Sequence, residues 1–238
     1  MLSKSDIKFL RSLSLKKTRD ESGLFIVEGE KMVEEAIKSD FQVDRVLYMK
    51  DIGENDMSKI TLLSSPSPAF AILRRKQYPN NISIDSGKLY LALDSIRDPG
   101  NLGTIIRLSD WFGIESIIAS EDTVDMYNPK VIQASMGAIF RIKMYYTNLY
   151  DFIGKNRADT DVYGTFLNAA NIYNETLSGC GIVVMGSESN GISKDIESLI
   201  TKKLYIPSFA GKEDRSSESL NVAIATAIVC SEFRRSSV

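Results

Sequence analysis

The sequence lacks histidine altogether across its 238 residues. Imidazole is the most frequent general base and the most frequent metal ligand in proteins, so any catalysis here has to use other side chains. The chain has only two cysteines, Cys180 and Cys230, and their spacing matches no metal or redox motif. Their apolar neighbours predict two buried thiols in a reducing compartment.

Long apolar runs are missing as well. No run of about eighteen uncharged apolar residues occurs, and the first residues, Met1 to Lys8, contain no apolar stretch of signal-peptide length. We therefore expect a cytoplasmic protein without a membrane span. The net charge is −2, so the chain as a whole does not attract polyanions, and binding to nucleic acid would need a local basic patch.

The length and the 43% hydrophobic content allow a small domain joined to a larger one. Residues 1–80 predict a small α/β unit, with helices over 5–15 and 31–38 and strands over 24–27 and 43–49. Residues 64–87 contain Ser-Pro-Ser-Pro and Asn-Asn with weak apolar patterning, which predicts a domain connection within 75–87.

Basic residues crowd the start of this unit. Either they form a solvated helix face or they form a phosphate-contacting patch, and the sequence leaves both interpretations open. The residues are Lys4, Lys8, Arg11, Lys16, Lys17 and Arg19.

Residues 88–238 repeat the order strand, loop, helix, which predicts a parallel sheet covered by helices. A closing helix is expected over 219–233, with Ser219 as its N-cap. No Gly-x-Gly-x-x-Gly followed by an acidic residue about twenty positions later occurs after the first strand, which argues against a nucleotide-dependent dehydrogenase. The expected strands cover 89–93, 114–119, 139–145, 162–167, 182–185 and 204–206.

In open parallel sheets, ligands bind in loops beyond the carboxyl ends of the strands. The loop after strand 89–93 contains Pro-Gly-Asn-Leu-Gly, in which Gly100 and Gly103 permit a tight turn or a close approach to a ligand. Asn101 and Arg107 are the polar candidates there. Taken alone, this segment is equally an ordinary turn followed by a surface arginine.

Two later loops have the same character. The loop after strand 182–185 carries Glu188 between glycines, and Ser193 is placed to cap the next helix. The third begins at Ile206 and ends at Ser219 and Asn221, which open an otherwise apolar helix. Taken separately, Glu188 is equally a solvated carboxylate and Ser219 an ordinary helix cap. Only the ordered combination of the three segments points to a particular function.

That ordered combination resembles the three motifs of the SpoU (TrmH) family of the SPOUT superfamily, over residues 88–235. The first motif pairs an Asn in Pro-Gly-Asn-x-Gly with an Arg six residues on, matched by Asn101 and Arg107. The remaining matches are Gly186, Ser187, Glu188 and Gly191 in the second motif and Ile206, Pro207, Ser219, Leu220, Asn221, Val222 and Ala225 in the third.

Weaker matches and departures accompany these motifs. Residues 130–137 resemble the family's intermediate Ser-x-Gly segment, and residues 25–29 resemble the ribosomal-protein-like, substrate-binding domain that precedes many members. Ser189 stands in place of a usual glycine, and Ala223 in place of a usual serine. The polar segment 208–218 is longer than usual in the family. Three roles are open for it: it covers the cofactor, it moves as a lid, or it alters which RNA is accepted.

The resemblance implies a catalytic domain with a deep trefoil knot, which is otherwise essentially absent from proteins. It implies S-adenosylmethionine as cofactor and no metal. It also implies a homodimer whose active site borders the interface, with Cys230 and Phe233 of the closing helix as candidate interface residues. The residues it assigns to the cofactor are Thr165, Gly186, Gly191, Ile206 and Leu220.

The activity implied is methyl transfer to a ribose 2′-hydroxyl of RNA, with ribosomal RNA favoured over transfer RNA. A guanidinium keeps its proton in proteins, so Arg107 is interpreted as a phosphate clamp that also stabilises the developing alkoxide, and the base stays open. The alternatives are a transfer-RNA methyltransferase and an RNA-binding protein without catalysis. The full catalytic set is Asn101, Arg107, Glu188, Ser219 and Asn221.

Overall fold

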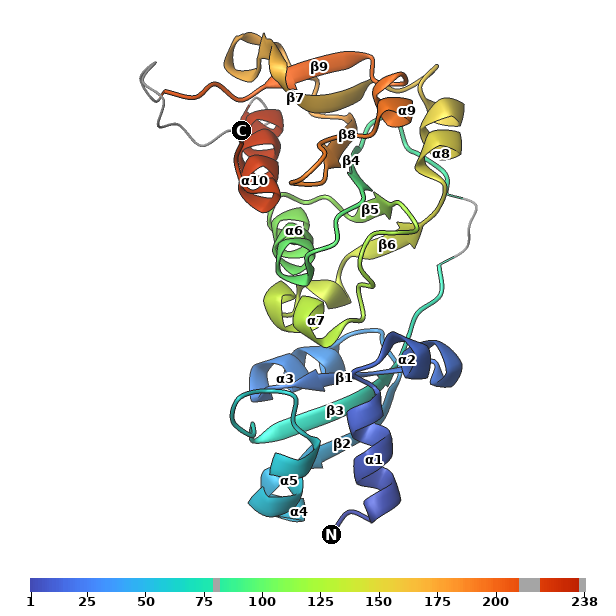
Figure 1. Cartoon of the computed structure of the whole chain (residues 1–238), viewed down its shortest axis with the longest axis vertical. Coiled ribbons are helices and arrows are strands. Elements are labelled where there is room, and N and C mark those ends of the chain that lie inside the picture. Colours follow the sequence, from blue (N-terminus) through green and yellow to red (C-terminus); the bar gives the residue numbers. More distant parts are fainter. Residues whose placement is uncertain (79–81, 210–218, 236–238) are drawn as a thin grey trace.

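The computed structural model describes residues 1–78, 82–209 and 219–235. An N-terminal unit with a three-stranded antiparallel sheet lies at one end of the long axis, and a C-terminal unit with a six-stranded parallel sheet lies at the other (Figure 1). This arrangement confirms the predicted α/β class, with a small unit ahead of a larger parallel-sheet domain. The trefoil knot implied by the resemblance stays a prediction.

The N-terminal unit packs helices on both faces of its sheet, whose strand order is β1-β3-β2. Ile26 and Ile72 pair across β1 and β3 and face Leu10 and Met57 of α1 and α5, whereas Phe25 and its neighbours face the opposite side. The elements are α1 (Lys4–Ser12), α2 (Lys16–Ser22), β1 (Leu24–Glu28), α3 (Glu30–Lys38), β2 (Val43–Tyr48), α4 (Met49–Ile52), α5 (Glu54–Ile60) and β3 (Ala69–Arg74).

Strand β3, the middle strand of this sheet, is missing from the sequence prediction. Its first five residues are all buried, and a strand covered on both faces reads as a short apolar run without alternation. The neighbouring Ser-Pro-Ser-Pro obscured it further. The helix expected over 5–15 was also wrong in extent, because α1 ends at Ser12 and α2 begins after a turn.

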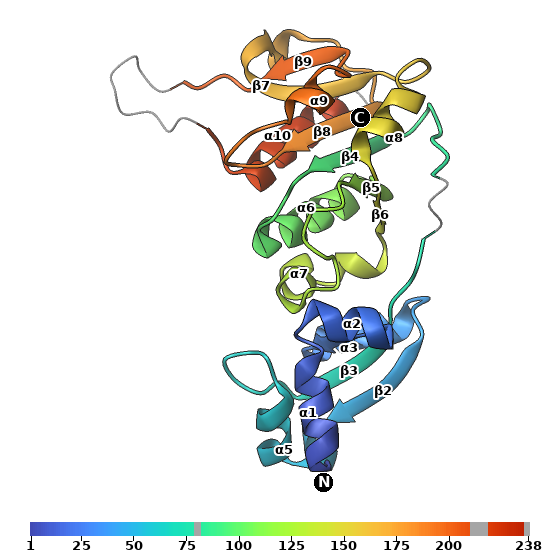
Figure 2. The same ribbon diagram turned by 45° about the vertical axis from the view of Figure 1, so that its right-hand side comes forward.

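The C-terminal sheet has the order β6-β5-β4-β8-β7-β9, and all its pairings are parallel. Helices α6 and α10 cover one face, and α8 and α9 cover the other (Figures 1 and 2). The elements are β4 (Leu89–Asp94), α6 (Pro99–Trp111), β5 (Ser116–Ala119), α7 (Pro129–Ser135), the 3-10 turn η1 (Ala138–Phe140), β6 (Lys143–Tyr146), α8 (Leu149–Asn156), β7 (Val162–Asn171), the 3-10 turn η2 (Ile172–Asn174), β8 (Gly181–Gly186), α9 (Lys194–Glu197), β9 (Lys202–Tyr205) and α10 (Val222–Arg235).

Strand β4 shows why this sheet forms. Leu91 and Leu93 point to the core shared with α6 and α10, whereas Tyr90 and Ala92 point to the core shared with α8 and α9. A strand buried on both faces is apolar throughout, and each large side chain buried in this way contributes roughly 1.5–3 kcal/mol.

Three expectations for this unit need correction. Strand β6 begins at Lys143 rather than at residue 139, because Ala138–Phe140 form a 3-10 turn. The closing helix begins at Val222 rather than at residue 219. Cys230 is buried as predicted, but Cys180 is only half-buried.

The strand order creates a switch point between β4 and β8, which are neighbours although their paired first residues, Leu89 and Gly181, are 92 positions apart in the sequence. Asp94 at the end of β4 lies in register with Gly186 at the end of β8. The chain leaves β4 toward β5 on one side and returns through β7 on the other. Open α/β sheets bind ligands at such a point, beyond the carboxyl ends of the strands.

The two units are joined by buried side chains. Phe25 stacks on Tyr127 with ring centroids 4.6 Å apart. Arg19 lies 2.8 Å from Asp125, and both side chains are almost fully buried. This corrects one interpretation of the basic cluster, because Arg19 is 1% exposed and cannot contact a phosphate. Arg141 adds a half-exposed bridge from Asp110 on α6 to the N-terminal unit.

Candidate active site

Three polar side chains from three separate segments form one hydrogen-bonded chain at the switch point. The Asn101 Nδ2 group donates to Oε1 of Glu188. The Asn221 Nδ2 group donates to Oδ1 of Asn101 at 2.9 Å. The structure therefore brings together one predicted residue from each of the three motifs, which lie up to 120 residues apart in the sequence.

Asn101 is held by the start of α6. Asp98 is the N-cap, and its side chain accepts a hydrogen bond from the Asn101 backbone N–H at 2.8 Å, while Pro99 occupies the first helical position. Asn101 thus lies in the first turn of a helix rather than in a loop. Gly103 faces α7, where a Cβ would come within 2.5 Å of the Ala134 Cβ, so this glycine allows close helix packing and not approach to a ligand.

Glu188 sits on a tight turn after β8. The turn is closed by Ser187 and Gly191, whose backbone groups exchange hydrogen bonds of 3.1 and 2.8 Å. Gly191 has a φ of +66°, and a Cβ on Gly186 would lie 2.1 Å from the Gly191 carbonyl carbon. Both glycines are therefore required by the turn. The departure at Ser189 is accommodated, because its side chain is exposed and its φ is not positive.

Asp94 is a site residue that the sequence prediction missed. It is 5% exposed at the end of β4, and its Oδ2 accepts a hydrogen bond from the Ser193 backbone N–H at 2.7 Å. It therefore ties the second loop to the first. Ser193 occupies the N-cap position of α9 as predicted, but its hydroxyl makes no capping hydrogen bond. An acidic residue ending an apolar strand was the available signal.

Asn221, and not Ser219, caps α10. Its Oδ1 accepts hydrogen bonds from the backbone N–H groups of Ala223 at 3.0 Å and Ile224 at 3.3 Å. Because Oδ1 faces these donors, Nδ2 faces Asn101, and the Asn101 amide is in turn oriented toward Glu188. The N-terminus of α10 thus fixes which atom of Asn221 and Asn101 donates and which accepts in this series of hydrogen bonds. Ser219 is exposed and makes no hydrogen bond within the described part of the chain.

Arg107 takes no part in the hydrogen bonds that join Asn101, Glu188 and Asn221. Six residues along an α-helix correspond to about 9 Å of rise and a turn to a different face, so Arg107 does not point in the same direction as Asn101. Its side chain is exposed and forms no ion pair or hydrogen bond with residues 1–78, 82–209 or 219–235. The expectation that Asn101 and Glu188 hold the Arg107 side chain is not met in the single chain.

The residues expected to hold a cofactor come from neighbouring strands at the same edge of the sheet. Gly186 ends β8, Thr165 lies in β7 opposite Leu204 of β9, and Ile206 follows β9. Thr165, Gly186 and Ile206 are half-buried. Gly191 and Leu220 are exposed, with Leu220 in the stretch before α10.

Of the polar segment 208–218, for which three roles were left open, residues 210–218 lie outside the described residues. Among the residues that the structure describes, no group of three potential metal-ligating side chains is found. No helix in the described ranges is both long enough and apolar enough to cross a membrane.

Residues 88–231 match the model of the SpoU rRNA Methylase family, which covers more than half of the chain. The chain belongs to the SpoU rRNA methylase family. Residues 4–82 match a second model, described as an MRM3-like substrate binding domain. The family that the motifs indicated is therefore confirmed.

Individual relatives cover the whole chain. The 23S rRNA (guanosine(2553)-2′-O)-methyltransferase RlmP of Bacillus subtilis is 29% identical, and the match covers 96% of this chain and 95% of that protein. A TrmH-family structure from Porphyromonas gingivalis is 36% identical, with a TM-score of 0.88 and 99% of each chain covered. An AdoMet-bound rRNA methyltransferase from Sinorhizobium meliloti is 31% identical, with a TM-score of 0.88, covering 100% of this chain and 97% of that one.

One prediction about the assembly conflicts with the packing seen in this SpoU family member. Cys230 and Phe233 are both 0% exposed, and Phe233 packs edge-on against Tyr163 with centroids 4.8 Å apart. These side chains fill the interior of their own chain and are not available to a second subunit. The helical pattern of α10 identified an apolar face, but that face is covered by the chain's own sheet.

Proposed function

We propose that the chain is an S-adenosylmethionine-dependent methyltransferase that methylates a ribose 2′-hydroxyl of ribosomal RNA. The observation that carries this proposal is the hydrogen-bonded chain of Asn101, Glu188 and Asn221 at the switch point of a SpoU family member. The names of the Bacillus and Sinorhizobium relatives, an rRNA 2′-O-methyltransferase and an AdoMet-bound rRNA methyltransferase, support the reaction, the cofactor and the substrate class.

The residues at the carboxyl edge fit S-adenosylmethionine. Gly191 is exposed and has open space where a Cβ would stand, so its main chain is accessible beside β8, whereas Gly186 packs directly against the Gly191 backbone. Main-chain groups of Ile206 and Leu220 make no hydrogen bond to another described residue, which suits a ligand held through the backbone. Thr165 is the hydroxyl side chain of the same edge. When bound, the cofactor supplies an electrophilic methyl group on sulfonium.

The remaining work of the site is positioning and proton removal. In this proposal, Asn101, Glu188 and Asn221 hold the loops in a single arrangement, and Ser219 lies at the entrance of α10 to support the ribose. Arg107 presents an unpaired guanidinium that clamps the adjacent phosphate and stabilises the developing alkoxide, because a guanidinium keeps its proton and presents several donors. The proton passes to phosphate, water or a carboxylate.

A homodimer is part of the proposal, with a contact face different from the predicted one. Trp111 is 84% exposed and lies one helical turn beyond Arg107 on α6, while Ile224 and Leu220 are 53% and 47% exposed at the start of α10. Helices α6 and α10 lie side by side and run in the same direction, because Asn221 bonds Asn101 at their starts and Arg234 bonds the Phe112 carbonyl at their ends, so exposed apolar side chains stand at both ends of this helix pair. A second copy covering it would place the active site at the interface.

The N-terminal unit is proposed to hold RNA. Lys4, Lys8 and Arg11 are exposed at helical spacing along α1 and form no ion pair among the described residues, in contrast to Lys16 and Lys17, which pair with acidic neighbours on α2. Three unpaired cations on one face provide phosphate contacts that the net charge of −2 does not suggest.

A groove between the two units reaches the start of α6. It has a volume of about 450 Å³ and is lined by Glu28 and Leu62 of the N-terminal unit and by Pro99, Lys130 and Gln133 of the C-terminal unit. Pro99 is two residues from Asn101, so RNA that spans both units would pass directly beside the hydrogen-bonded chain.

The test is methyl transfer from radiolabelled S-adenosylmethionine to unmethylated 23S rRNA and, in parallel, to transfer-RNA transcripts. We expect label in ribosomal RNA at a ribose, located by mapping 2′-O-methyl sites in RNA from cells with and without the gene. If label appears only in transfer RNA, the substrate is transfer RNA and not ribosomal RNA. Calorimetric titration that detects no cofactor binding would favour the RNA-binding protein without catalysis.

A further inference from the structure

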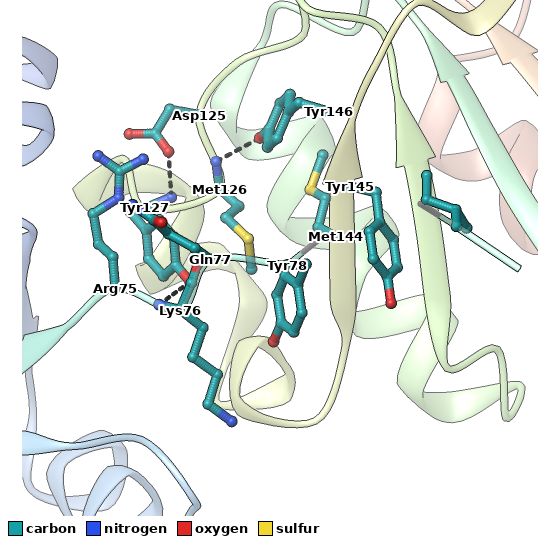
Figure 3. A pocket seen from close by; sticks show the side chains of 11 residues that line it. Arg75, Lys76, Gln77, Tyr78, Asp125, Met126, Tyr127, Met144, Tyr145 and Tyr146 are labelled. Carbon is teal, nitrogen blue, oxygen red and sulfur yellow. Dashed lines mark hydrogen bonds between the residues drawn. The ribbon is translucent and has the colours of Figure 1, made fainter. Parts of the chain in front are cut away.

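The connection between the two units encloses a second cavity, separate from the active site and from the groove beside it. Its volume is about 270 Å³ (Figure 3). One wall is the connecting segment, residues 75–78 with Ile82, and the other is strand β6 with the loop that precedes α7. The side chains that line it include Gln77, Tyr78, Met126, Tyr127, Met144 and Tyr145.

Four tyrosines line this cavity, but only two of them serve the fold. The Tyr127 hydroxyl bonds both backbone groups of Lys76, and the Tyr146 hydroxyl accepts from the Met126 N–H at 2.8 Å and donates to a carbonyl. The hydroxyls of Tyr78 and Tyr145 make no hydrogen bond with any described residue. Their rings lie 5.4 Å apart at 53° and are half-buried, so each keeps part of a flat face accessible (Figure 3).

The charged groups around the cavity are already paired. Arg75 pairs with Asp20, Lys76 pairs with Asp40, and Asp125 pairs with the buried Arg19. The cavity therefore offers no unpaired charge to a phosphate or a carboxylate. It offers two aromatic faces, an apolar floor and free neutral hydrogen-bonding groups at Gln77 and the two phenols. Burial raises the pKa of Tyr78 to about 12, so its hydroxyl keeps its proton well above neutral pH.

The cavity lies at the same edge of the sheet as the active site. Tyr146 is in register with Ala119 of β5, and Ala119 is in register with Leu93, the residue before Asp94. Only β5 separates β6 from β4, which corresponds to about 10 Å across the sheet. An RNA strand that lies on this edge can therefore engage both places.

We propose that this cavity binds one unpaired nucleobase of the RNA substrate, other than the base of the methylated nucleotide. A nucleobase is flat and uncharged, and it stacks on tyrosine while its edge forms hydrogen bonds with neutral groups. The Tyr78 and Tyr145 rings supply the stacking surface, and their hydroxyls with the Gln77 side chain supply the polar contacts. This inference rests on the proposed function only in taking RNA as the substrate.

The test compares Tyr78→Ala and Tyr145→Ala with a matched control, Tyr150→Ala, which removes a 48%-exposed tyrosine from α8 outside the cavity. The dissociation constant for an unmethylated 23S rRNA transcript is measured by filter binding, and that for S-adenosylmethionine by calorimetry. We expect each cavity variant to bind RNA about 5- to 150-fold more weakly, since that is the range for losing one stacked base. The control variant and cofactor binding should be unchanged.

Photocrosslinking of wild-type protein to the same transcript, with 4-thiouridine incorporated, provides a readout that does not depend on the variants folding. Crosslinks to the peptides containing Tyr78 or Tyr145 are expected. Crosslinks confined to other peptides, or cavity variants whose RNA affinity stays within about twofold of wild type, would overturn the nucleobase site. Ribose methylation of the transcript by wild type, measured alongside, separates that result from failure of the proposed function.

Discussion

The active-site edge and the joint between the two units are held together in different ways. At the edge, each loop is shaped by its own short segment, as Asp98 caps α6 and the two glycines close the turn that carries Glu188. At the joint, stability comes from partners far apart in the sequence, such as Arg19 and Asp125, which are 106 residues apart. Local motifs therefore shape the segments of the site, while long-range pairs set the orientation of the N-terminal unit toward it.

The largest expected effect is on the joint. Arg19→Ala leaves Asp125 buried without its partner, so we expect the free energy of unfolding to fall by about 3–5 kcal/mol. Urea denaturation measures this. The double variant with Asp125→Ala should recover part of the loss, because no unpaired charge then remains buried. If the single variant is as stable as wild type, the joint does not depend on this pair.

Arg107→Ala should show the opposite behaviour. Its side chain is exposed and unpaired, so stability should change by no more than about 0.5 kcal/mol. Methyl transfer should fall about 10²- to 10³-fold, because a donor to the developing charge is lost, while calorimetry should show nearly unchanged cofactor binding. Undiminished turnover would remove Arg107 from the mechanism.

Trp111→Glu tests whether two copies of the chain associate through the exposed end of α6. A charge in place of an 84%-exposed indole should weaken self-association at least about 30-fold, as expected for a central interface aromatic. Analytical ultracentrifugation gives the dimer dissociation constant, and Trp111→Phe is the matched control. A wild-type protein that sediments as a monomer would contradict the proposed homodimer.

Asn221→Ala probes the cap that orients the hydrogen-bonded chain. Losing an N-cap costs about 1 kcal/mol of stability, and here it also frees the Asn101 amide from its fixed direction. Asn221→Asp keeps the cap but replaces the donor to Asn101, so it should preserve stability and still lower activity. Equal activity in wild type and both variants would show that the hydrogen bond from Asn221 to Asn101 is not needed for methyl transfer.

The smallest effect is expected from the triple change of Lys4, Lys8 and Arg11 to glutamine. These side chains are exposed and unpaired, so the fold should be unaffected. The slope of log affinity for RNA against log salt concentration should flatten by about 2, since each lost phosphate contact contributes about 0.7–0.9. The same change at Lys16 and Lys17, which are already paired, is the control.

Much of the C-terminal sheet could be predicted from the sequence, because strands buried on both faces are continuous apolar runs that any arrangement has to cover. Strand β4 and strand β8 were located within one residue at each end. The limits of prediction appear where tertiary contacts override local pattern. The run at residues 139–142 is apolar enough for a strand, but the chain turns there as η1 before β6 begins.

For the site, the ordered motifs that resemble those of the SpoU family grouped Asn101, Glu188 and Asn221, and the structure joins these three side chains by hydrogen bonds. The sequence could not show that Asn221 rather than Ser219 caps α10, or that Asp94 bridges two loops, since a hydrogen-bond partner depends on which backbone lies opposite.

Periodicity predicted the α/β class and most strands of the C-terminal sheet, and short motifs predicted the three segments that carry the polar site residues, but the middle strand β3 of the N-terminal sheet was missed. The burial of Arg19 at the joint, the place of Phe233 in the interior and the contact of Tyr78 with Tyr145 beside β6 became visible only in the folded structure. The physical reason is that burial and pairing are properties of two surfaces brought together, and a linear pattern describes only one of them.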